Sequence, residues 1–292
     1  MSAAHDTAAN PQPRTNTVVL GVEYDGRCFH GLQSQAGVAT VQDALEQAIA
    51  RVGNQSPSET RIVAAGRTDA GVHATQQVVS FAASAERTED AWRLGITSLT
   101  PDGLGVVWCR KAPSDFSARF DATWRRYVYV IQDGSPRPII ARGVCAWAEQ
   151  RLDDAAMQQA ALPLIGEHDF SAFRAAACQS RSPWRCIHHL RVRRIGSFVA
   201  IDIQANAFVL RMVRNIAGTL LAVGRSTLPQ DAPAELLAGR DRRQAPPTAP
   251  AQGLYLIDVG YRSIPQPPPP PPPHRGGGGR NINTPNRTTT AA

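Results

Sequence analysis

The chain has 292 residues, with 31 lysine and arginine residues against 24 aspartate and glutamate residues, which gives a formal net charge of +7. Hydrophobic residues make up 42% of the sequence and charged residues 19%, as is typical of a soluble globular protein. The sequence contains no run of about 20 apolar residues, the length that spans a bilayer, which excludes a transmembrane protein.

The N-terminus and the cysteines both indicate a cytoplasmic protein. Residues 1–17 have neither the basic start nor the apolar stretch of a secretory signal. The five cysteines are scattered and include no Cys-x-x-Cys pair, so neither a disulfide framework nor a metal site is expected. The excess of positive charge is compatible with an anionic partner such as nucleic acid.

Both ends of the chain have the composition of disordered segments. Residues 1–16 are polar and contain two prolines. Residues 265–292 are rich in proline and glycine and carry three arginines without an acidic residue. Neither segment has enough apolar side chains to bury a core, so we predict that both are disordered.

Between these ends, hydrophobic periodicity predicts the same order of elements twice. In the first half, strands are predicted at 17–24, 61–66, 77–83 and 105–111, with helices that begin at Thr40 and Thr88. In the second half, strands are predicted at 123–132, 186–194, 198–205 and 254–261, and helices at 153–165, 208–223 and 232–239. Apart from the short last helix, each half has the β-α-β-β-α-β order of a ferredoxin-like unit. We therefore predict an α+β fold with domains at 17–113 and 114–264, whose sheets either join or face each other across a cleft.

A polar loop bounded by glycines, between two predicted strands, contains the first candidate catalytic residues. Gly66 and Gly71 enclose Arg67, Thr68 and Asp69. Loops that project from the edge of a sheet often carry catalytic groups. In the alternative interpretation, the loop is an ordinary turn in which Asp69 caps backbone N–H groups and Arg67 is its surface partner.

The predicted helix at 208–223 carries an arginine beside its core-facing positions. Burying an unpaired guanidinium is costly, so Arg214 needs a carboxylate, and Asp69 is a candidate. Alternatively, Arg214 lies at the rim of the core and extends to water. An ion pair would keep Asp69 ionised at neutral pH, which suits a nucleophile better than a general acid.

Aromatic and basic residues alternate along residues 116–131, and alternation on a strand puts Arg125 and Tyr127 on one face. Proteins that bind splayed RNA use aromatic rings to stack on bases and arginines to hold the backbone. The alternative is a half-buried strand with its arginines outside. A further basic stretch, 168–195, is polar in its middle, as expected of a mobile contact loop.

Five segments together resemble the tRNA pseudouridine synthase A family. They are GVEYDGRCFHGLQSQAGVATVQDALEQA (21–48), GRTDAGVHA (66–74), FSARFDATWRRYVYVI (116–131), HDFSAFRA (168–175) and NAFVLRMVRNIAG (206–218). The resemblance covers nearly all of residues 17–262, and five motifs in one order at compatible spacing are far more specific than an Arg-Thr-Asp triplet alone. One departure is Arg211, which stands where the family pattern has a histidine or a similar residue.

The resemblance implies an enzyme that isomerises uridine to pseudouridine at positions 38, 39 and 40 in the anticodon stem-loop of tRNA. It also implies the pseudouridine synthase fold with a basic RNA-binding cleft, no cofactor, no metal, and a homodimer as the working unit. A paired uridine hides its glycosidic bond in the base stack, so such an enzyme must flip the nucleotide out.

The resemblance also implies roles for individual residues. Asp69 is the expected nucleophile, which attacks either the sugar at C1′ or the base. Tyr127 is expected to stack on the target base and to assist proton removal, and Arg214 to pair with Asp69. Arg67 is expected to enter the space that the flipped nucleotide vacates. The other expected contacts with the stem-loop are Phe116, Arg119, Phe120, Gln179 and Arg181.

Two other classes of function are compatible with parts of the sequence. A non-catalytic RNA-binding protein of the same fold would be marked by the loss of Asp69, but Asp69, Tyr127 and Arg214 are all present. A synthase of the same family could act on another RNA; the length of the chain, without an added RNA-binding domain, favours the compact tRNA enzyme. A metal-dependent or phosphate-dependent enzyme has no support, because the sequence has no P-loop and no ligand cluster.

Overall fold

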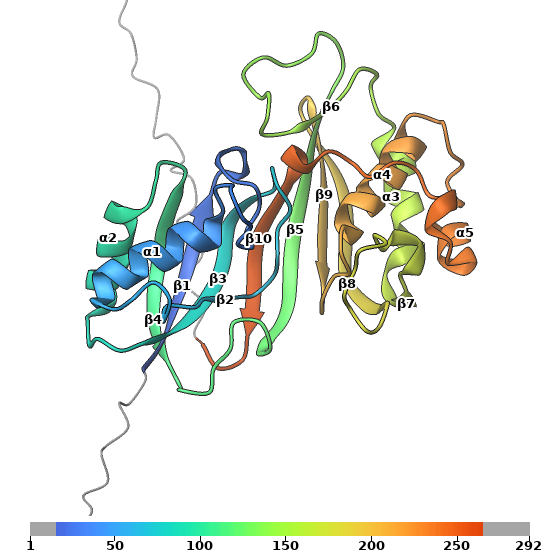
Figure 1. Cartoon of the computed structure of the whole chain (residues 1–292). Helices are drawn as coiled ribbons and strands as arrows, with labels where there is room; N and C mark the ends of the chain where they lie inside the picture. Colours follow the sequence, from blue (N-terminus) through green and yellow to red (C-terminus); the bar gives the residue numbers. More distant parts are fainter. Residues whose placement is uncertain (1–15, 265–292) are drawn as a thin grey trace, which may run out of the picture.

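The computed structural model of the protein describes residues 16–264 (Figure 1). The segments predicted to be disordered, 1–16 and 265–292, lie outside the described residues except for Asn16, where the first strand begins. The first half contains β1 (Asn16–Tyr24), α1 (Val41–Gly53), β2 (Val63–Ala64), β3 (His73–Ala83), α2 (Glu89–Leu99) and β4 (Leu104–Ala112). The second half contains β5 (Ala122–Asp133), β6 (Ala146–Ala148), α3 (Asp154–Ala161), β7 (Gly166–Asp169), β8 (Trp184–Ile195), β9 (Phe198–Ala205), α4 (Met212–Gly224), α5 (Ala232–Gly239) and β10 (Leu254–Tyr261).

The strands form one mixed sheet in the order β4-β1-β3-β10-β5-β9-β8-β7, with β2 paired to β3 and β6 paired to β5. The same local order occurs twice, as β4-β1-β3-β2 in the first half and β10-β5-β9-β8 in the second. Of the two arrangements considered from the sequence, the sheets therefore join edge to edge. The predicted domain boundary after residue 113 falls in the linker between β4 and β5, and it stays a prediction.

The last strand in the described part of the chain, β10, makes the junction between the two halves. β10 runs parallel to the start of β3, where Tyr255 lies opposite His73 and Leu256 opposite Ala74. Its other edge is antiparallel to β5 (Figure 1). The predicted strand at 61–66 is correspondingly short, because β2 pairs only with the distal part of β3 and the chain then leaves the sheet. The loop that carries Asp69 therefore ends at His73, beside the junction.

The helices divide into two groups that cover the two ends of the sheet. Figure 1 shows α1 and α2 over the first half and α3, α4 and α5 over the second, with β10 and β5 between them. The helices predicted at Thr40 and Thr88 begin directly after these residues, and both threonines accept hydrogen bonds from backbone N–H groups in the first turn. Within the described part of the chain, no helix is both long and apolar enough to cross a membrane.

Helix α4 begins four residues later than its apolar periodicity predicts. Arg211 adopts the left-handed conformation, with φ at 60°, and so precedes the helix instead of belonging to it. Residues 208–211 form a loop that reaches the space between the two groups of helices. From Met212 onward the helix is almost entirely buried.

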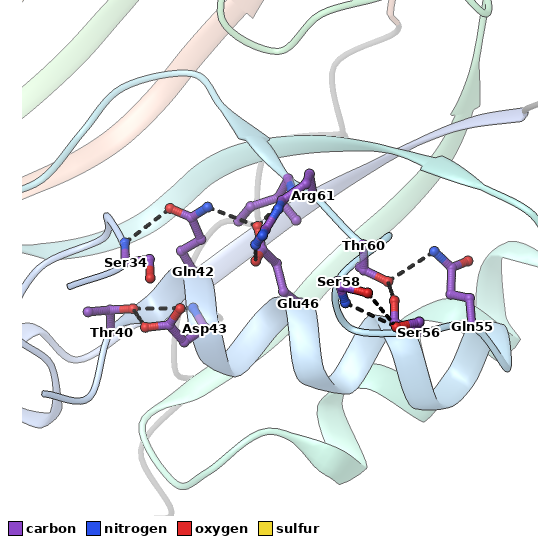
Figure 2. Close-up of polar contacts among 11 residues, drawn as sticks. Ser34, Thr40, Gln42, Asp43, Glu46, Gln55, Ser56, Ser58, Thr60 and Arg61 are labelled. Carbon is purple, nitrogen blue, oxygen red and sulfur yellow. Dashed lines mark hydrogen bonds and ion pairs between the residues drawn. The ribbon is translucent and has the colours of Figure 1, made fainter. Parts of the chain in front are cut away.

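A buried carboxylate on α1 fixes the segment that leads into β2 (Figure 2). Glu46 is 4% exposed and accepts hydrogen bonds from Gln42 Nε2 at 2.8 Å, Arg61 Nη1 at 2.9 Å and the Ile62 backbone N–H at 3.1 Å. A buried charge needs such partners, so α1 and the chain before β2 are held together. The loop with Asp69 thus starts from a fixed base.

Candidate active site

A cleft of about 900 Å³ lies between the two groups of helices. Its walls come from the loop after β2, the linker before β5, the loop before β8 and the loop before α4. The predicted site residues that line it are Arg67, Asp69, Arg119, Phe120, Tyr127, Gln179 and Arg214. Phe116 does not line the cleft, because it is buried against Tyr261 with the ring centres 5.3 Å apart. Arg181 is exposed and also lies outside the lining.

Asp69 lies in a tight turn, but its side chain does not cap that turn. Gly71 has φ at +79°, which favours glycine, and the Val72 N–H donates to the Asp69 carbonyl at 3.1 Å. Among the described residues, the Asp69 carboxylate accepts no backbone hydrogen bond and is not paired with Arg67. The turn therefore presents the carboxylate to the cleft instead of using it locally.

Two arginines at the start of α4 face the Asp69 carboxylate. Arg214 Nη1 lies 2.5 Å from Asp69 Oδ2, and Arg214 Nε donates to the Ala249 carbonyl at 2.9 Å. Arg211 Nε lies 3.6 Å from the same Oδ2, and its side chain is 50% exposed against 14% for Arg214. The N-terminal end of a helix also favours negative charge. Both contacts engage Oδ2, so Oδ1 has no hydrogen-bond partner among the residues that the structure describes.

Tyr127 forms part of the cleft floor on β5. It is 7% exposed, and its ring lies nearly perpendicular to that of Phe208 with the ring centres 5.2 Å apart. Burial raises the pKa of the Tyr127 hydroxyl above its ordinary value of 10.0, and nearby Tyr24 and Asp69 add to the effect. The hydroxyl is therefore protonated at neutral pH. No group in the described part of the chain is hydrogen-bonded to it, so its donor is available to a ligand in the cleft.

A buried polar network anchors the loop that carries Asp69. The Tyr24 hydroxyl and Thr68 Oγ1 lie 2.8 Å apart, and Gln77 Nε2 donates to the Gly66 carbonyl at 2.8 Å. Burial raises the pKa of Tyr24 to about 12, so its hydroxyl keeps its proton. On the other side, the Leu32 N–H donates to the Thr68 carbonyl at 3.1 Å. These bonds fix the residues on either side of Arg67 and so limit how far the loop moves.

His73, which closes the glycine-bounded motif, lies at the junction of the two halves. Its Nδ1 accepts a hydrogen bond from the Gly26 N–H at 3.1 Å, and its ring stacks on Tyr255 with the centres 4.6 Å apart. Burial lowers the pKa of His73, so the ring is neutral at neutral pH, as the bond from Gly26 requires. His73 is 4% exposed and does not line the cleft. We therefore assign His73 a structural role at the junction of the two halves and no role as a functional group of the cleft.

The cleft has a strong imbalance of charge. The arginines that line it are Arg67, Arg119, Arg125, Arg185, Arg211 and Arg214. Asp69 is the one acidic residue in the same lining. The described residues contain no group of three or more histidine, cysteine or acidic side chains that could hold a metal ion. A cleft with six arginines and one carboxylate suits a polyanionic ligand that meets a single reactive group.

The sequence does not identify three residues of the cleft as members of the site: Phe208, Arg125 and Arg185. Its periodicity predicts Phe208 inside a helix, and the contact of Phe208 with Tyr127 depends on the loop that replaces the first turn of that helix. Arg125 was placed correctly on the face of Tyr127 by alternation, but its partners come from distant segments. No spacing in the sequence indicates Arg185.

Comparisons with known proteins show the family to which the chain belongs. The profile of the family described as tRNA pseudouridine synthase matches residues 21–121 and 160–262, well over half of the chain, and the chain belongs to this family. A protein named tRNA pseudouridine synthase A from Aeromonas hydrophila subsp. hydrophila is 50% identical over 84% of this chain and 90% of its own. Proteins of the same name from Klebsiella pneumoniae subsp. pneumoniae and Citrobacter koseri are 49% and 48% identical, over 84% and 87% of this chain and 89% and 93% of theirs.

Proposed function

We propose that this protein isomerises uridine to pseudouridine in tRNA, at positions 38, 39 and 40 of the anticodon stem-loop. Its family and the name of relatives that are about half identical support the reaction and the class of RNA. The observation that carries the proposal is the placement of Asp69, the one acidic residue in the lining of a cleft with six arginines. That placement combines a nucleophile with a surface for a polyanion.

In the proposed reaction the bond between uracil N1 and the sugar C1′ breaks, and a bond between C5 and C1′ forms. Asp69 acts as the nucleophile, either at C1′ or on the base, and leaves again when the new bond is complete. The C5 proton is lost and N1 gains a proton, so the product is an isomer of the substrate. The Asp69 Oδ1 atom suits the attack, because both arginine contacts go to Oδ2.

The neighbouring residues take the remaining roles. Arg214 holds the carboxylate in one orientation through its 2.5 Å contact. Tyr127 offers its ring to the flipped base and its protonated hydroxyl to a polar atom of the substrate. Arg67 enters the helical stack in place of the extruded nucleotide. Flipping costs a few kcal/mol, which stacking and phosphate contacts in the cleft offset.

Further residues contact the tRNA, and the enzyme works in a particular compartment and oligomeric state. Arg119, Phe120, Gln179 and Arg181 contact the stem-loop around the cleft; Phe116, also expected there, is buried and supports the linker that carries Arg119. The enzyme works in the cytoplasm, where its tRNA substrates are, and as a homodimer. Sedimentation of the free protein and of its tRNA complex tests whether the enzyme is a homodimer. A monomer in both states would refute the homodimer.

The first experiment measures tritium release from tRNA that contains 5-tritiated uridine, with wild type, Asp69→Asn and Asp241→Asn. Asp241 is the matched control, because it is an ion-paired aspartate outside the cleft, with Arg243 at 2.7 Å. We expect Asp69→Asn to lose at least about 10⁴-fold in rate while it still binds tRNA, and the control to behave as wild type. Appreciable release by Asp69→Asn would refute the nucleophile.

A second set of substrates tests the position. The uridines at positions 38, 39 and 40 are replaced one at a time, and release should fall by the contribution of each replaced nucleotide. Full release from a tRNA that lacks all three would refute the stem-loop assignment. A tRNA that is bound without any release would instead favour a synthase for another RNA or a non-catalytic binder.

A further inference from the structure

One guanidinium joins separate walls of the cleft. Arg125 lies on β5, and its Nε and Nη2 donate to the Ala65 carbonyl at 3.2 Å and 2.9 Å. Its Nη1 donates to the carbonyls of Ala122 and Asn206, both at 3.0 Å, and its Nη2 also donates to the Arg119 carbonyl at 2.7 Å. Every nitrogen of the side chain is therefore engaged with backbone oxygens of the protein itself.

Three of these carbonyls belong to three different segments that form the site. Ala65 directly follows β2 and begins the loop that carries Asp69. Arg119 lies in the linker before β5. Asn206 opens the loop that carries Phe208, whose ring packs on Tyr127. Arg125 precedes Tyr127 by two positions and so projects from the same face of β5. A single side chain thus sets the spacing between the Asp69 loop and the wall that holds Tyr127.

The charge of Arg125 has no counter-ion in the described part of the chain. Burial lowers the pKa of Arg125, which reflects the cost of removing a charge from water, yet a guanidinium stays protonated in proteins. No carboxylate compensates this cost, and the carbonyl dipoles of the loops do so instead. A planar fork can reach several carbonyls at once, whereas the single ammonium group of a lysine cannot.

We propose that Arg125 is a positioning residue, which holds the Asp69 loop at a fixed distance from Tyr127 and makes no contact with RNA phosphates. The inference rests on the proposed function, since it gives Arg125 a part in the same reaction. It also revises the interpretation of the alternating aromatic and basic run, in which arginines were expected to hold the RNA backbone. The N–H donors of Arg125 are instead hydrogen-bonded to backbone carbonyls of the protein itself.

The test compares Arg125→Lys and Arg125→Gln with Arg126→Gln. Arg126 is the matched control, because it is the next residue on β5, points to the opposite face and pairs with Asp202 at 2.5 Å. The single-turnover rate on saturating tRNA and the dissociation constant at several salt concentrations are measured for each. We expect Arg125→Lys to lose about 10²-fold in rate despite its retained charge, because small displacements of reacting groups cost that much. The Arg126→Gln rate should stay close to that of wild type.

Binding separates positioning from phosphate contact. For a positioning residue, the slope of log affinity against log salt concentration is the same in wild type and Arg125→Gln. A phosphate contact would reduce the slope by about 0.7 to 0.9. A reduced slope, or a wild-type rate in Arg125→Lys, would overturn the proposal.

Hydrogen exchange gives a measurement that does not depend on turnover. In Arg125→Lys, amides of residues 64–70 and 206–211 should exchange faster, while those of α1 and α2 should not change. Unchanged exchange in both loops would overturn the proposal even if the rate falls. A wild-type protein that releases no tritium from any RNA would refute the proposed function instead, and exchange would then decide the role of Arg125 alone.

Discussion

The guanidinium of Arg67 donates a hydrogen bond to the side-chain oxygen of Gln179 at 3.2 Å, although the two residues are 112 positions apart in the chain. Arg67 comes from the loop beside Asp69 and Gln179 from the loop before β8, and both line the cleft. The bond therefore bridges two walls of the site. If Arg67 replaces a flipped nucleotide, it must first release Gln179, and an exposed hydrogen bond of this kind is inexpensive to break.

Arg67→Ala should impair extrusion of the nucleotide more than docking of the tRNA. Without a side chain to fill the stack, the cost of flipping the nucleotide, a few kcal/mol, is not offset. We therefore expect about a 10²-fold lower single-turnover rate on a paired uridine. An unpaired target uridine should lose much less. The measurement compares both substrates with Gln179→Ala as a second variant. Equal rates of Arg67→Ala and wild type on both substrates would refute the proposal that Arg67 replaces the flipped nucleotide.

The two arginines that face Asp69 should differ widely in effect. Arg214→Lys loses the bond to Ala249 and the fixed contact with Asp69, so we expect kcat to fall at least about 10²-fold. Arg211→Lys should stay within about 5-fold of wild type, because an exposed pair contributes about 0–1 kcal/mol. Steady-state tritium release at saturating tRNA checks both. A larger loss in Arg211→Lys than in Arg214→Lys would contradict the assignment.

Tyr127→Phe should separate the ring from the hydroxyl. The ring remains available for stacking, so we expect the affinity for tRNA to be retained. The hydroxyl has no partner among the described residues and is offered to the substrate, so kcat should fall about 10²-fold. Because burial raises the pKa of Tyr127, the rate of wild type should show no change from its ionisation between about pH 6 and pH 9. A fully active Phe variant would leave the hydroxyl without a function.

The stability of the junction should depend on pH through His73. Burial lowers the pKa of His73 below 6.5, and Arg27 adds to this while Asp25 opposes it. The unfolded chain therefore binds a proton at a higher pH than the folded protein, and the free energy of unfolding falls as the pH drops below about 6.5. Urea unfolding between pH 7.5 and 5.5 should show a flatter dependence for His73→Gln than for wild type or the exposed control His188→Gln. An identical dependence in all three would contradict the prediction.

The order of the elements was predictable because each leaves a local pattern. Alternation along β5 buries Tyr127, Tyr129 and Ile131 in turn, and Thr40 marks the start of α1. The insertion of β10 between β3 and β5 was not predictable, because it depends on pairing between residues far apart. The start of α4 was predicted too early, since one left-handed residue, Arg211, outweighs an apolar periodicity that continues across it.

The site was predictable where a physical cost or a motif singled out a residue. The cost of burying Arg214 led to Asp69 before any contact was known, and the two are 2.5 Å apart. Contacts with backbone carbonyls leave no pattern in the sequence, so the proposed positioning role of Arg125 cannot be distinguished there from contact with RNA. The aromatic ring of Phe116 favours a contact with RNA in the sequence, but in the structure the ring packs in the core.

The position of β10 in the sequence limits the order in which the sheet can form during synthesis. The strand that joins the halves is the last one among residues 16–264, so during synthesis β3 has an unpaired edge at His73 until residues 254–261 have emerged. Unpaired edges invite pairing with other chains. Arg214 and its anchor Ala249 also come late, so Asp69 is translated long before the groups that orient it. In a nascent chain the carboxylate of Asp69 is therefore present before the groups that orient it, and the proposed site is complete only after β10 has paired with β3 and β5.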